Sequence, residues 1–296
     1  MQQHAIVFGG SGFLGSHVAD ELTSQGMNVT IFDLNESPFI MPQQNFIKGD
    51  ILDAKAVAES CRGKDFIYNF AGLADINAAK DNPLLTAQLN IIGQVNVLEG
   101  ARQAKCKRFI YASTVYVYSE SGSFYRISKQ AGEKYTEQYW EKYQLPYSIL
   151  RYGSLYGPRS DHRNAIYRFI ESALKEGKIH YSGTGDELRE YIHVGDAAKA
   201  SVDILKPEFQ NQHFVITGSQ LFRVRDVITM ISEILHGVKV EAIFENKDLE
   251  AHYNITPYAF KPRLGKKYMV NPFVDMGQGI LDCVEQIHKS KSKSNE

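Results

Sequence analysis

The first half of the chain alternates between short apolar runs and longer stretches in which apolar residues recur every three or four positions. The short runs predict buried strands, and the longer stretches predict amphipathic helices. We expect strands over residues 3–8, 29–32, 45–48, 65–69, 108–111 and 147–151, and helices over 13–22, 53–61, 83–105 and 126–143. Strands that alternate with helices in this way favour an α/β fold built on a Rossmann-like, doubly wound parallel sheet.

This alternation changes near residue 155. Beyond it we expect helices over 165–176, 196–205, 224–235 and 274–288, strands over 178–181, 189–194 and 213–216, and an irregular stretch over 241–261. We therefore predict a first domain over residues 1–155, to which segments near 190–217 return, and a smaller C-terminal α/β lobe over 156–288. Residues 289–296 are polar and low in complexity, so a disordered tail is expected.

Composition excludes several classes of partner. The 296 residues contain 33 Lys and Arg against 34 Asp and Glu, without a basic run, so no nucleic-acid surface is expected. Cys61, Cys106 and Cys283 are far apart, which gives no metal-ligand spacing and favours reduced thiols in a cytoplasmic protein. No apolar run reaches the length of a membrane span, and the N-terminus leads directly into a predicted strand, so neither a membrane segment nor a signal peptide is expected.

A glycine-rich loop follows the first predicted strand, with Gly9, Gly12 and Gly15 spaced three residues apart. Gly9 allows a tight turn, Gly12 lets a pyrophosphate approach the backbone, and Gly15 lets the next helix pack on the strand. That helix begins at Phe13 and Leu14, and its free N–H groups and positive dipole end favour phosphate. Strand, glycine turn and helix in this order predict a dinucleotide site, against the alternative of a turn that merely needs glycine.

Asp33 ends the second predicted strand. In a dinucleotide-binding sheet, an acidic residue at this place hydrogen-bonds the ribose hydroxyls and repels a 2′-phosphate. No Arg or Lys follows closely, so NAD is predicted rather than NADP; the alternative is an ordinary turn aspartate.

The helix expected after the fifth strand carries Tyr125 and Lys129, the one Tyr-x-x-x-Lys pair in the chain. Residues four apart share a helix face, so the ammonium group is expected to lower the phenol pKa from its usual value of about 10. A tyrosine tuned in this way can take a proton from an alcohol while hydride leaves the carbon. Thr114, at the end of the fifth strand, can hold the same oxygen. Many helices carry both residue types, so the pair gains weight only because the glycine loop precedes it.

With these motifs in this order, the chain resembles the extended short-chain dehydrogenase/reductase proteins, within them the nucleotide-sugar epimerase/dehydratase group. The similarity includes Phe70 to Leu73, which looks like a stretch of the UDP-galactose 4-epimerases, and Gly183-x-Gly185-x-x-x-Arg189. It implies Thr114, Tyr125 and Lys129 as catalytic residues. It implies NAD contacts from Gly9, Gly12, Phe13, Leu14, Gly15, Asp33, Asp50, Ile51, Phe70, Ala71, Gly72, Asn90, Tyr125, Lys129 and Tyr152. It also implies a nucleotide-diphosphate sugar as the substrate, held by Leu73, Tyr116, Ser154, Arg159, Arg189 and Arg263.

The resemblance further implies hydride transfer at C4 of the nucleotide-linked sugar, in a 4-epimerase or a 4-dehydrogenase. A 4-ketoreductase and a catalytically silent NAD-sensing protein of the same fold are alternatives, and hexose, deoxysugar and heptose all stay open. The family's 4,6-dehydratases carry Asp-Glu directly after the catalytic threonine, where this chain has Val115 and Tyr116, so a dehydratase is not expected.

The helices over 83–105 and 126–143 are expected to pair in a homodimer, as in family dimers. His162 is interpreted as a solvated loop residue, with a second acid or base as the alternative.

Overall fold

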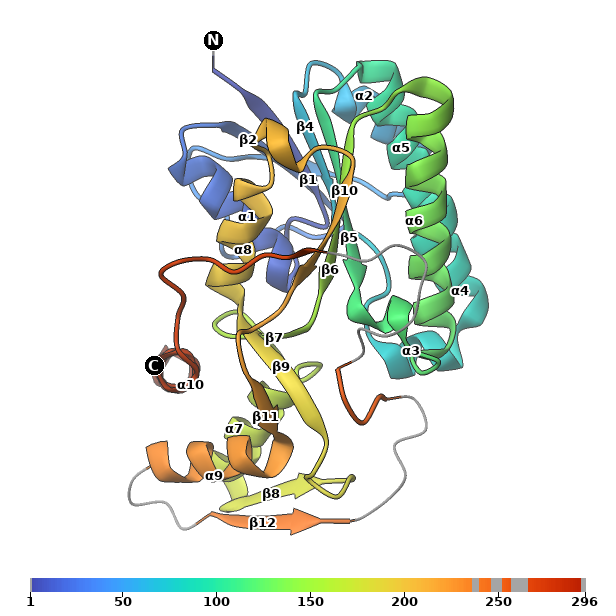
Figure 1. The fold of residues 1–296 in the computed structure, drawn as a ribbon. Helices are drawn as coiled ribbons and strands as arrows, with labels where there is room; N and C mark the ends of the chain where they lie inside the picture. Colours follow the sequence, from blue (N-terminus) through green and yellow to red (C-terminus); the bar gives the residue numbers. More distant parts are fainter. Residues whose placement is uncertain (1, 236–239, 246–251, 257–265, 294–296) are drawn as a thin grey trace.

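A parallel sheet forms the centre of the larger lobe in the computed structural model, which describes residues 2–235, 240–245, 252–256 and 266–293 (Figure 1). The strand order is β13-β10-β6-β5-β4-β1-β2-β3, and every neighbouring pair is parallel. The strands are β1 (His4–Phe8), β2 (Asn28–Asp33), β3 (Asn45–Lys48), β4 (Phe66–Asn69), β5 (Arg108–Thr114), β6 (Tyr147–Tyr152), β10 (Gln212–Ile216) and β13 (Lys266–Lys267). The chain moves outward in opposite directions from β1 and from β4, so the predicted doubly wound sheet is confirmed. Its switch point, where such sheets bind ligands, lies between these two strands.

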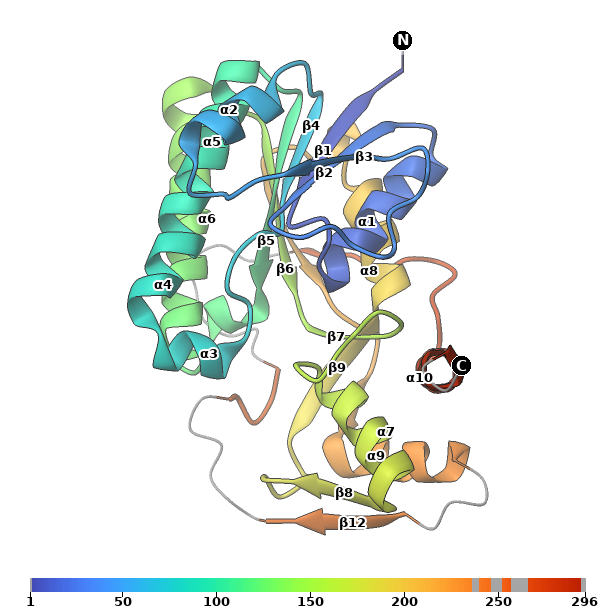
Figure 2. The ribbon, with the colours of Figure 1, turned by 180° about the vertical axis from the view of Figure 1, so that it is seen from behind.

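Helices cover both faces of this sheet (Figures 1 and 2). One face carries α1 (Phe13–Ser24) and α8 (Val194–Asp203), and the other carries α2 (Ala54–Cys61), α5 (Gly93–Ala104) and α6 (Ser123–Tyr143). Each layer closes its own apolar core against the sheet. Because both faces are covered, the central strands are buried along nearly their whole length, which explains why they read as continuous apolar runs.

The stretch expected as one helix over 83–105 is a composite of three segments. α4 (Pro83–Ala87) passes into a π-helical segment, η1 (Gln88–Ile92), and then into α5. A π segment adds one residue to a turn and shifts the faces of the helix relative to each other. In this chain the segment contains the buried side chain of Asn90.

The smaller lobe follows the carboxyl end of β6 (Figure 1). A three-stranded sheet of β7 (Ser154–Tyr156), β9 (Leu188–His193) and β11 (Leu221–Arg223) leads into it, and β8 (Lys178–Tyr181) pairs with β12 (Glu241–Phe244). The apolar faces of α7 (Ala165–Glu176), α9 (Val224–Ile234) and α10 (Met276–Lys293) close a third core. Among the described residues, three further helical segments are short: α3 (Ile76–Asp81), η2 (Val115–Tyr118) and η3 (Pro207–Phe209).

Two predictions about the C-terminal part are wrong. Residues 241–244, expected to be irregular, form β12, because β8 offers them a parallel partner that lies about sixty positions earlier in the sequence. The tail expected over 289–296 continues α10 as far as Lys293, and Lys289 pairs with Glu285 one turn earlier at 3.4 Å. Residues 294–296 lie outside the described residues.

No helix among the described residues is long and apolar enough to cross a membrane. These residues also contain no group of His, Cys, Asp or Glu side chains arranged to hold a metal ion.

Candidate active site

At two of its glycines, the loop between β1 and α1 leaves no room for a side chain. Gly9 has a φ of +75°, and a Cβ there would lie 2.5 Å from the backbone nitrogen of Ala71. A Cβ on Gly15 would collide with the backbone oxygen of Gly9. Gly12 is the N-cap of α1 and supplies no side-chain cap, so the N–H groups of the first turn are not claimed by a side chain. This open helix start fits a pyrophosphate.

Asp33, the last residue of β2, is hydrogen-bonded to the glycine loop. Its carboxylate accepts hydrogen bonds from the backbone N–H of Ser11 at 3.1 Å and of Asn35 at 3.4 Å. The Ser11 hydroxyl is buried and has no hydrogen-bond partner within the described part of the chain. A negative charge therefore lies beside the loop, where an NAD ribose would bind and a 2′-phosphate would be repelled.

We expect the protein to bind NAD more tightly than NADP, and Asp33→Asn to shift this preference toward NADP by about fivefold or more. Two unit charges about 4 Å apart repel by about 1 kcal/mol even in bulk water, and the amide removes that repulsion while keeping the size of the side chain. Calorimetric titration of both dinucleotides measures the change. Tighter binding of NADP by the unaltered protein would contradict the role given to Asp33.

The segment after β4 is fixed by Asn90, which the sequence predicts as a cofactor contact. Its side-chain amide accepts a hydrogen bond from the N–H of Leu73 at 2.7 Å and donates to the Leu73 carbonyl at 3.0 Å and the Ser128 hydroxyl at 2.9 Å. Asn90 therefore ties the loop after β4 to α6. Leu73 is predicted to contact the substrate, and both its backbone N–H and its carbonyl are hydrogen-bonded to Asn90.

Other predicted cofactor contacts are also engaged within the protein. The Tyr152 hydroxyl lies 2.6 Å from the Ser201 hydroxyl, and its ring packs near Phe70 in the core. Ile51 is buried against Gly93, and the Asp50 carboxylate caps the turn that follows by accepting the N–H of Leu52 at 2.9 Å. The structure thus places these side chains near the carboxyl ends of the sheet strands.

Thr114, Tyr125 and Lys129 meet where β5 ends beside α6. The Tyr125 hydroxyl is hydrogen-bonded with Thr114. The Lys129 ammonium donates to the carbonyl of Ala112 at 2.8 Å and lies 5.8 Å from the centre of the Tyr125 ring. The three predicted catalytic side chains are therefore brought together.

The expected lowering of the Tyr125 pKa is not seen in the protein alone. Burial raises the pKa of Tyr125 to about 12, although the hydrogen bond with Thr114 acts in the opposite direction. Burial likewise lowers the pKa of Lys129 to about 8, with the nearby Glu133 carboxylate opposing that change. The prediction was wrong because it counted the attraction of the ammonium and omitted the cost of burying a phenolate.

Behind this trio, a buried ion pair joins α6 to β6. Glu133 lies one turn after Lys129, and its carboxylate accepts hydrogen bonds from Arg151 at 2.6 and 2.8 Å. Ser113 donates to the same carboxylate, and Arg151 donates to the Tyr118 hydroxyl, both at 2.5 Å. Every member of the network is buried, so it fixes α6 against the strand ends that carry the trio.

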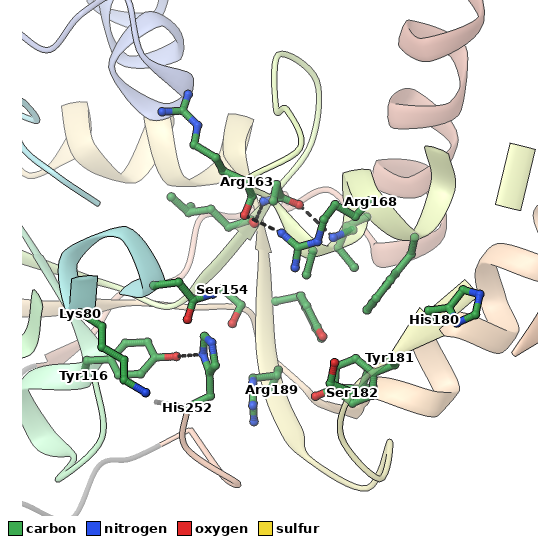
Figure 3. A pocket seen from close by; sticks show the side chains of 18 residues that line it. Lys80, Tyr116, Ser154, Arg163, Arg168, His180, Tyr181, Ser182, Arg189 and His252 are labelled. Carbon is green, nitrogen blue, oxygen red and sulfur yellow. Dashed lines mark hydrogen bonds between the residues drawn. The ribbon is translucent and has the colours of Figure 1, made fainter. Parts of the chain in front are cut away.

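A cavity of about 600 Å³ opens between the two lobes, and its lining includes Tyr116, whose ring meets that of Tyr125 edge to face (Figure 3). Tyr116, Ser154 and Arg189, three of the predicted substrate contacts, line it. Arg189 is positioned by hydrogen bonds to the carbonyls of Leu188 at 3.0 Å and Asn254 at 3.3 Å.

The cavity is cationic. Its lining includes Lys80, Arg163, Arg168 and Arg189, together with His180 and His252, and contains no Asp or Glu among the described residues. Lys80, Arg168, His180 and His252 belong to no motif that the sequence offered as a site. Such a lining favours an anionic ligand such as a diphosphate.

Arg159 is not part of this cavity, which corrects a predicted substrate contact. Its guanidinium pairs with Asp20 of α1 at 2.6 Å and covers the Phe39 ring at 4.6 Å. The backbone N–H of Arg159 donates a hydrogen bond to the side chain of Gln286 in α10. A positive φ of 67° at Arg159 belongs to a turn that directs the chain toward these helices. The other predicted arginine, Arg263, lies outside the described residues. His162 is exposed and does not line the cavity, in keeping with its interpretation as a loop residue.

Comparison with known proteins agrees with this geometry. The model of the NAD dependent epimerase/dehydratase family matches residues 5–217, which span the glycine loop, the trio and most of the sheet. The chain belongs to this family. Its members include a protein of Methanocaldococcus jannaschii with the provisional name UDP-glucose 4-epimerase, 30% identical over 94% of this chain and 96% of that protein.

Two further comparisons indicate the range of similar proteins. The dTDP-D-glucose 4,6-dehydratase of Bos taurus is 27% identical over 82% of this chain and 76% of its own length. The UDP-glucuronic acid 4-epimerase of Bacillus cereus, solved with UDP-glucuronic acid and NAD, matches the fold with a TM-score of 0.85 over 97% of this chain and 100% of that one, at 22% identity. The epimerase/dehydratase fold is therefore common to relatives that bear the names of different activities.

Proposed function

We propose that this family member is an NAD-dependent oxidoreductase acting at C4 of a nucleotide-linked sugar, of the 4-epimerase type. The observation that carries the proposal is the position of Tyr125, which is hydrogen-bonded with Thr114 and meets edge to face the ring of Tyr116, a residue that lines the cationic cavity. The Tyr125 phenol is thus separated by one side chain from a cavity whose lining favours a diphosphate.

In this proposal each residue of the trio has a separate task. Bound NAD would supply a hydride acceptor for the sugar carbon. Tyr125 takes the proton of the hydroxyl on that carbon, and Thr114 holds the same oxygen in place. Lys129, beneath the Tyr125 ring, places a positive charge where a phenolate forms and would hold the nicotinamide ribose.

The names of relatives favour epimerisation over the alternatives. An epimerase returns the hydride to the opposite face of the transient 4-keto sugar, whereas a 4-dehydrogenase releases the ketone and a 4-ketoreductase works in reverse. A silent NAD sensor has no use for Thr114, Tyr125 and Lys129 brought together at one place, so an enzyme is favoured.

The nucleotide-diphosphate sugar is proposed to bind in the cationic cavity, with Arg189 on its diphosphate. Arg189→Ala is expected to raise the KM for a UDP-sugar by about tenfold or more and to leave NAD affinity unchanged, because a charge-assisted pair contributes about 1.5–3 kcal/mol. Steady-state kinetics measure this, with a thermal melt to check folding. The control is Arg225→Ala, an exposed arginine of the same lobe that pairs with Asp186. An unchanged KM in a folded Arg189 variant would place the diphosphate elsewhere.

We propose that the chain does not perform the dehydratase reaction found among its relatives. Val115 is buried and Tyr116 lines the cavity, so the two positions after Thr114 offer no carboxylate. With dTDP-glucose and NAD, no 4-keto-6-deoxy product is expected, while the Bos taurus dehydratase run in parallel should form it. Accumulation of that product would contradict the assignment.

A homodimer through α4 and α6 is also proposed. Leu84, Phe124 and Ile127 are 72%, 43% and 48% exposed on these helices, which is a high exposure for large apolar side chains. A two-fold pairing of the helices would bury them.

A further inference from the structure

Tyr116 and His252 form a polar pair at the edge of the cavity that the proposed reaction does not use. The Tyr116 hydroxyl lies 2.9 Å from Nδ1 of His252, and both side chains line the cavity (Figure 3). The rings of Tyr116 and Tyr125 meet edge to face, with their centres 6.4 Å apart. The pair is therefore a direct neighbour of the proposed catalytic base.

Tyr116 and His252 are each held in place by a different segment of the chain, on either side of the cavity. Tyr116 belongs to η2, and its N–H donates to the Thr114 hydroxyl at 3.3 Å. His252 precedes Tyr253, whose ring packs 4.5 Å from that of Tyr116. The short segment 252–256 is anchored along β9, where the N–H of Leu188 donates to the Asn254 carbonyl at 2.8 Å. The two side chains thus meet because two distant segments are each fixed by their own backbone bonds.

The surroundings decide which groups carry protons at neutral pH. Burial raises the pKa of Tyr116 well above its usual value, so the phenol keeps its proton. The pKa of His252 is lowered, first by burial and then by Arg189 of β9 and Arg168 of α7, while Asp75, just before α3, acts in the opposite direction. Lys80 of α3 lines the same cavity and adds positive charge near the pair. The imidazole is therefore neutral at pH 7 and has one N–H and one acceptor nitrogen.

We propose that His252 fixes the direction of the Tyr116 hydroxyl, so that Tyr116 accepts a hydrogen bond from a sugar hydroxyl next to the reacting one. This rests on the proposed function. The Tyr116 O–H donates to Nδ1 of neutral His252, which leaves the lone pairs of the phenol oxygen directed to the cavity. Protonated His252 instead donates from Nδ1, and the Tyr116 O–H then turns toward the sugar as a donor. Tyr116 is a specificity residue in this scheme, and His252 is the residue that positions its proton.

The scheme predicts a pH effect on the preference for the sugar nucleotide over the nucleotide alone. Above the pKa of His252 the cavity presents an acceptor at Tyr116, and below that pKa it presents a donor. Because the His252 pKa lies below the usual 6.5, the reversal occurs on the acid side of that value. Protonation of His252 also adds positive charge near Arg189, which acts on the diphosphate of UDP and of UDP-glucose alike, so the ratio of their dissociation constants isolates the sugar contact.

Calorimetric binding of UDP and of UDP-glucose between pH 5 and 8 tests the proposal without turnover. In Tyr116→Phe at pH 7.5 the Kd for UDP-glucose is expected to rise about two- to tenfold, as for the loss of one neutral hydrogen bond, with UDP unchanged. In His252→Gln the ratio of the two dissociation constants should become independent of pH. His162→Gln, which changes an exposed histidine that does not line the cavity, is the control and should keep the wild-type pH dependence. Histidine ¹⁵N spectra should show Nδ1 of neutral His252 without a proton.

The outcomes separate this inference from the proposed function. Failure of the unaltered protein to bind UDP would remove the proposed nucleotide-sugar function. Binding of UDP with equal affinity for UDP-glucose would overturn the Tyr116 contact alone. That contact is also overturned if Tyr116→Phe weakens UDP and UDP-glucose equally, or if neutral His252 carries its proton on Nδ1.

Discussion

Replacing Tyr125 with phenylalanine is expected to slow single-turnover reduction of bound NAD by the sugar nucleotide by about 10²–10⁴-fold, the usual range for loss of a general base. The change removes one oxygen and keeps the ring, so the edge-to-face contact with Tyr116 and the fold should persist. The phenol is hydrogen-bonded with Thr114, and in the protein alone its pKa of about 12 makes it a weak acid. A positive charge on bound NAD, added to that of Lys129, is expected to lower this pKa when substrate reacts.

Tyr135→Phe provides the matched control for this experiment. Tyr135 lies on the same helix, is 45% exposed, and does not line the cavity, so its variant should reduce NAD at the wild-type rate. NAD affinity, measured by titration, should be unchanged in both variants. If Tyr125→Phe also reduces NAD at the wild-type rate, proton removal belongs to another residue.

Glu133→Gln is expected to lower the free energy of unfolding by about 3–5 kcal/mol, which is the typical cost of leaving one member of a buried ion pair without its partner. Arg151 is fully buried, and two of its nitrogens bond the Glu133 carboxylate at 2.6 and 2.8 Å. The amide keeps the shape of the side chain but removes the charge that compensates the guanidinium, and it also weakens the bond from Ser113.

Denaturant unfolding of Glu171→Gln beside Glu133→Gln separates burial from charge. Glu171 is also a helical glutamate in an ion pair, with Lys175 at 2.8 Å, but its side chain is 28% exposed and that of Lys175 is 54% exposed, against 3% for Glu133 and 0% for Arg151. Exposed pairs contribute about 0–1 kcal/mol, so this variant should unfold near the wild-type denaturant concentration. A loss below about 1 kcal/mol in Glu133→Gln would show that the network contributes little to holding α6 on the sheet.

The parts of the fold that could be predicted are those encoded by neighbouring residues. The strand–glycine–helix order around Gly9 to Gly15 required no distant contact, and the sheet that it predicts is present with its switch point beside the loop. β12 could not be predicted, because its strand conformation depends on pairing with β8. The extension of α10 past residue 288 was missed because its sequence is polar, although pairs such as Glu285–Lys289 support a helix.

The candidate site likewise contains residues that the local sequence predicts and residues whose place depends on distant contacts. The Tyr125–Lys129 spacing placed both groups on one helix face, and Thr114 followed from the end of β5. His252 carried no local signal, because it reaches the cavity through backbone bonds between its segment and β9. Arg159 was predicted wrongly for the opposite reason: its sequence neighbourhood points to the sugar pocket, whereas its guanidinium pairs with Asp20 of α1 and covers the Phe39 ring. The raised pKa of Tyr125 depends on burial, which sequence spacing does not report.

The most direct test of the proposed chemistry is rapid-mixing absorbance of the NAD-loaded protein in the reduced-nicotinamide band. UDP-glucose, UDP-galactose, UDP-N-acetylglucosamine and dTDP-glucose would be added in turn, with UDP as the control that carries no sugar. We expect at least one of the sugar nucleotides to reduce bound NAD in the unaltered protein, UDP to leave it oxidised, and Tyr125→Phe to suppress the signal. If all four sugar nucleotides bind and none reduces NAD, oxidation of a nucleotide-linked sugar is not the activity of this site.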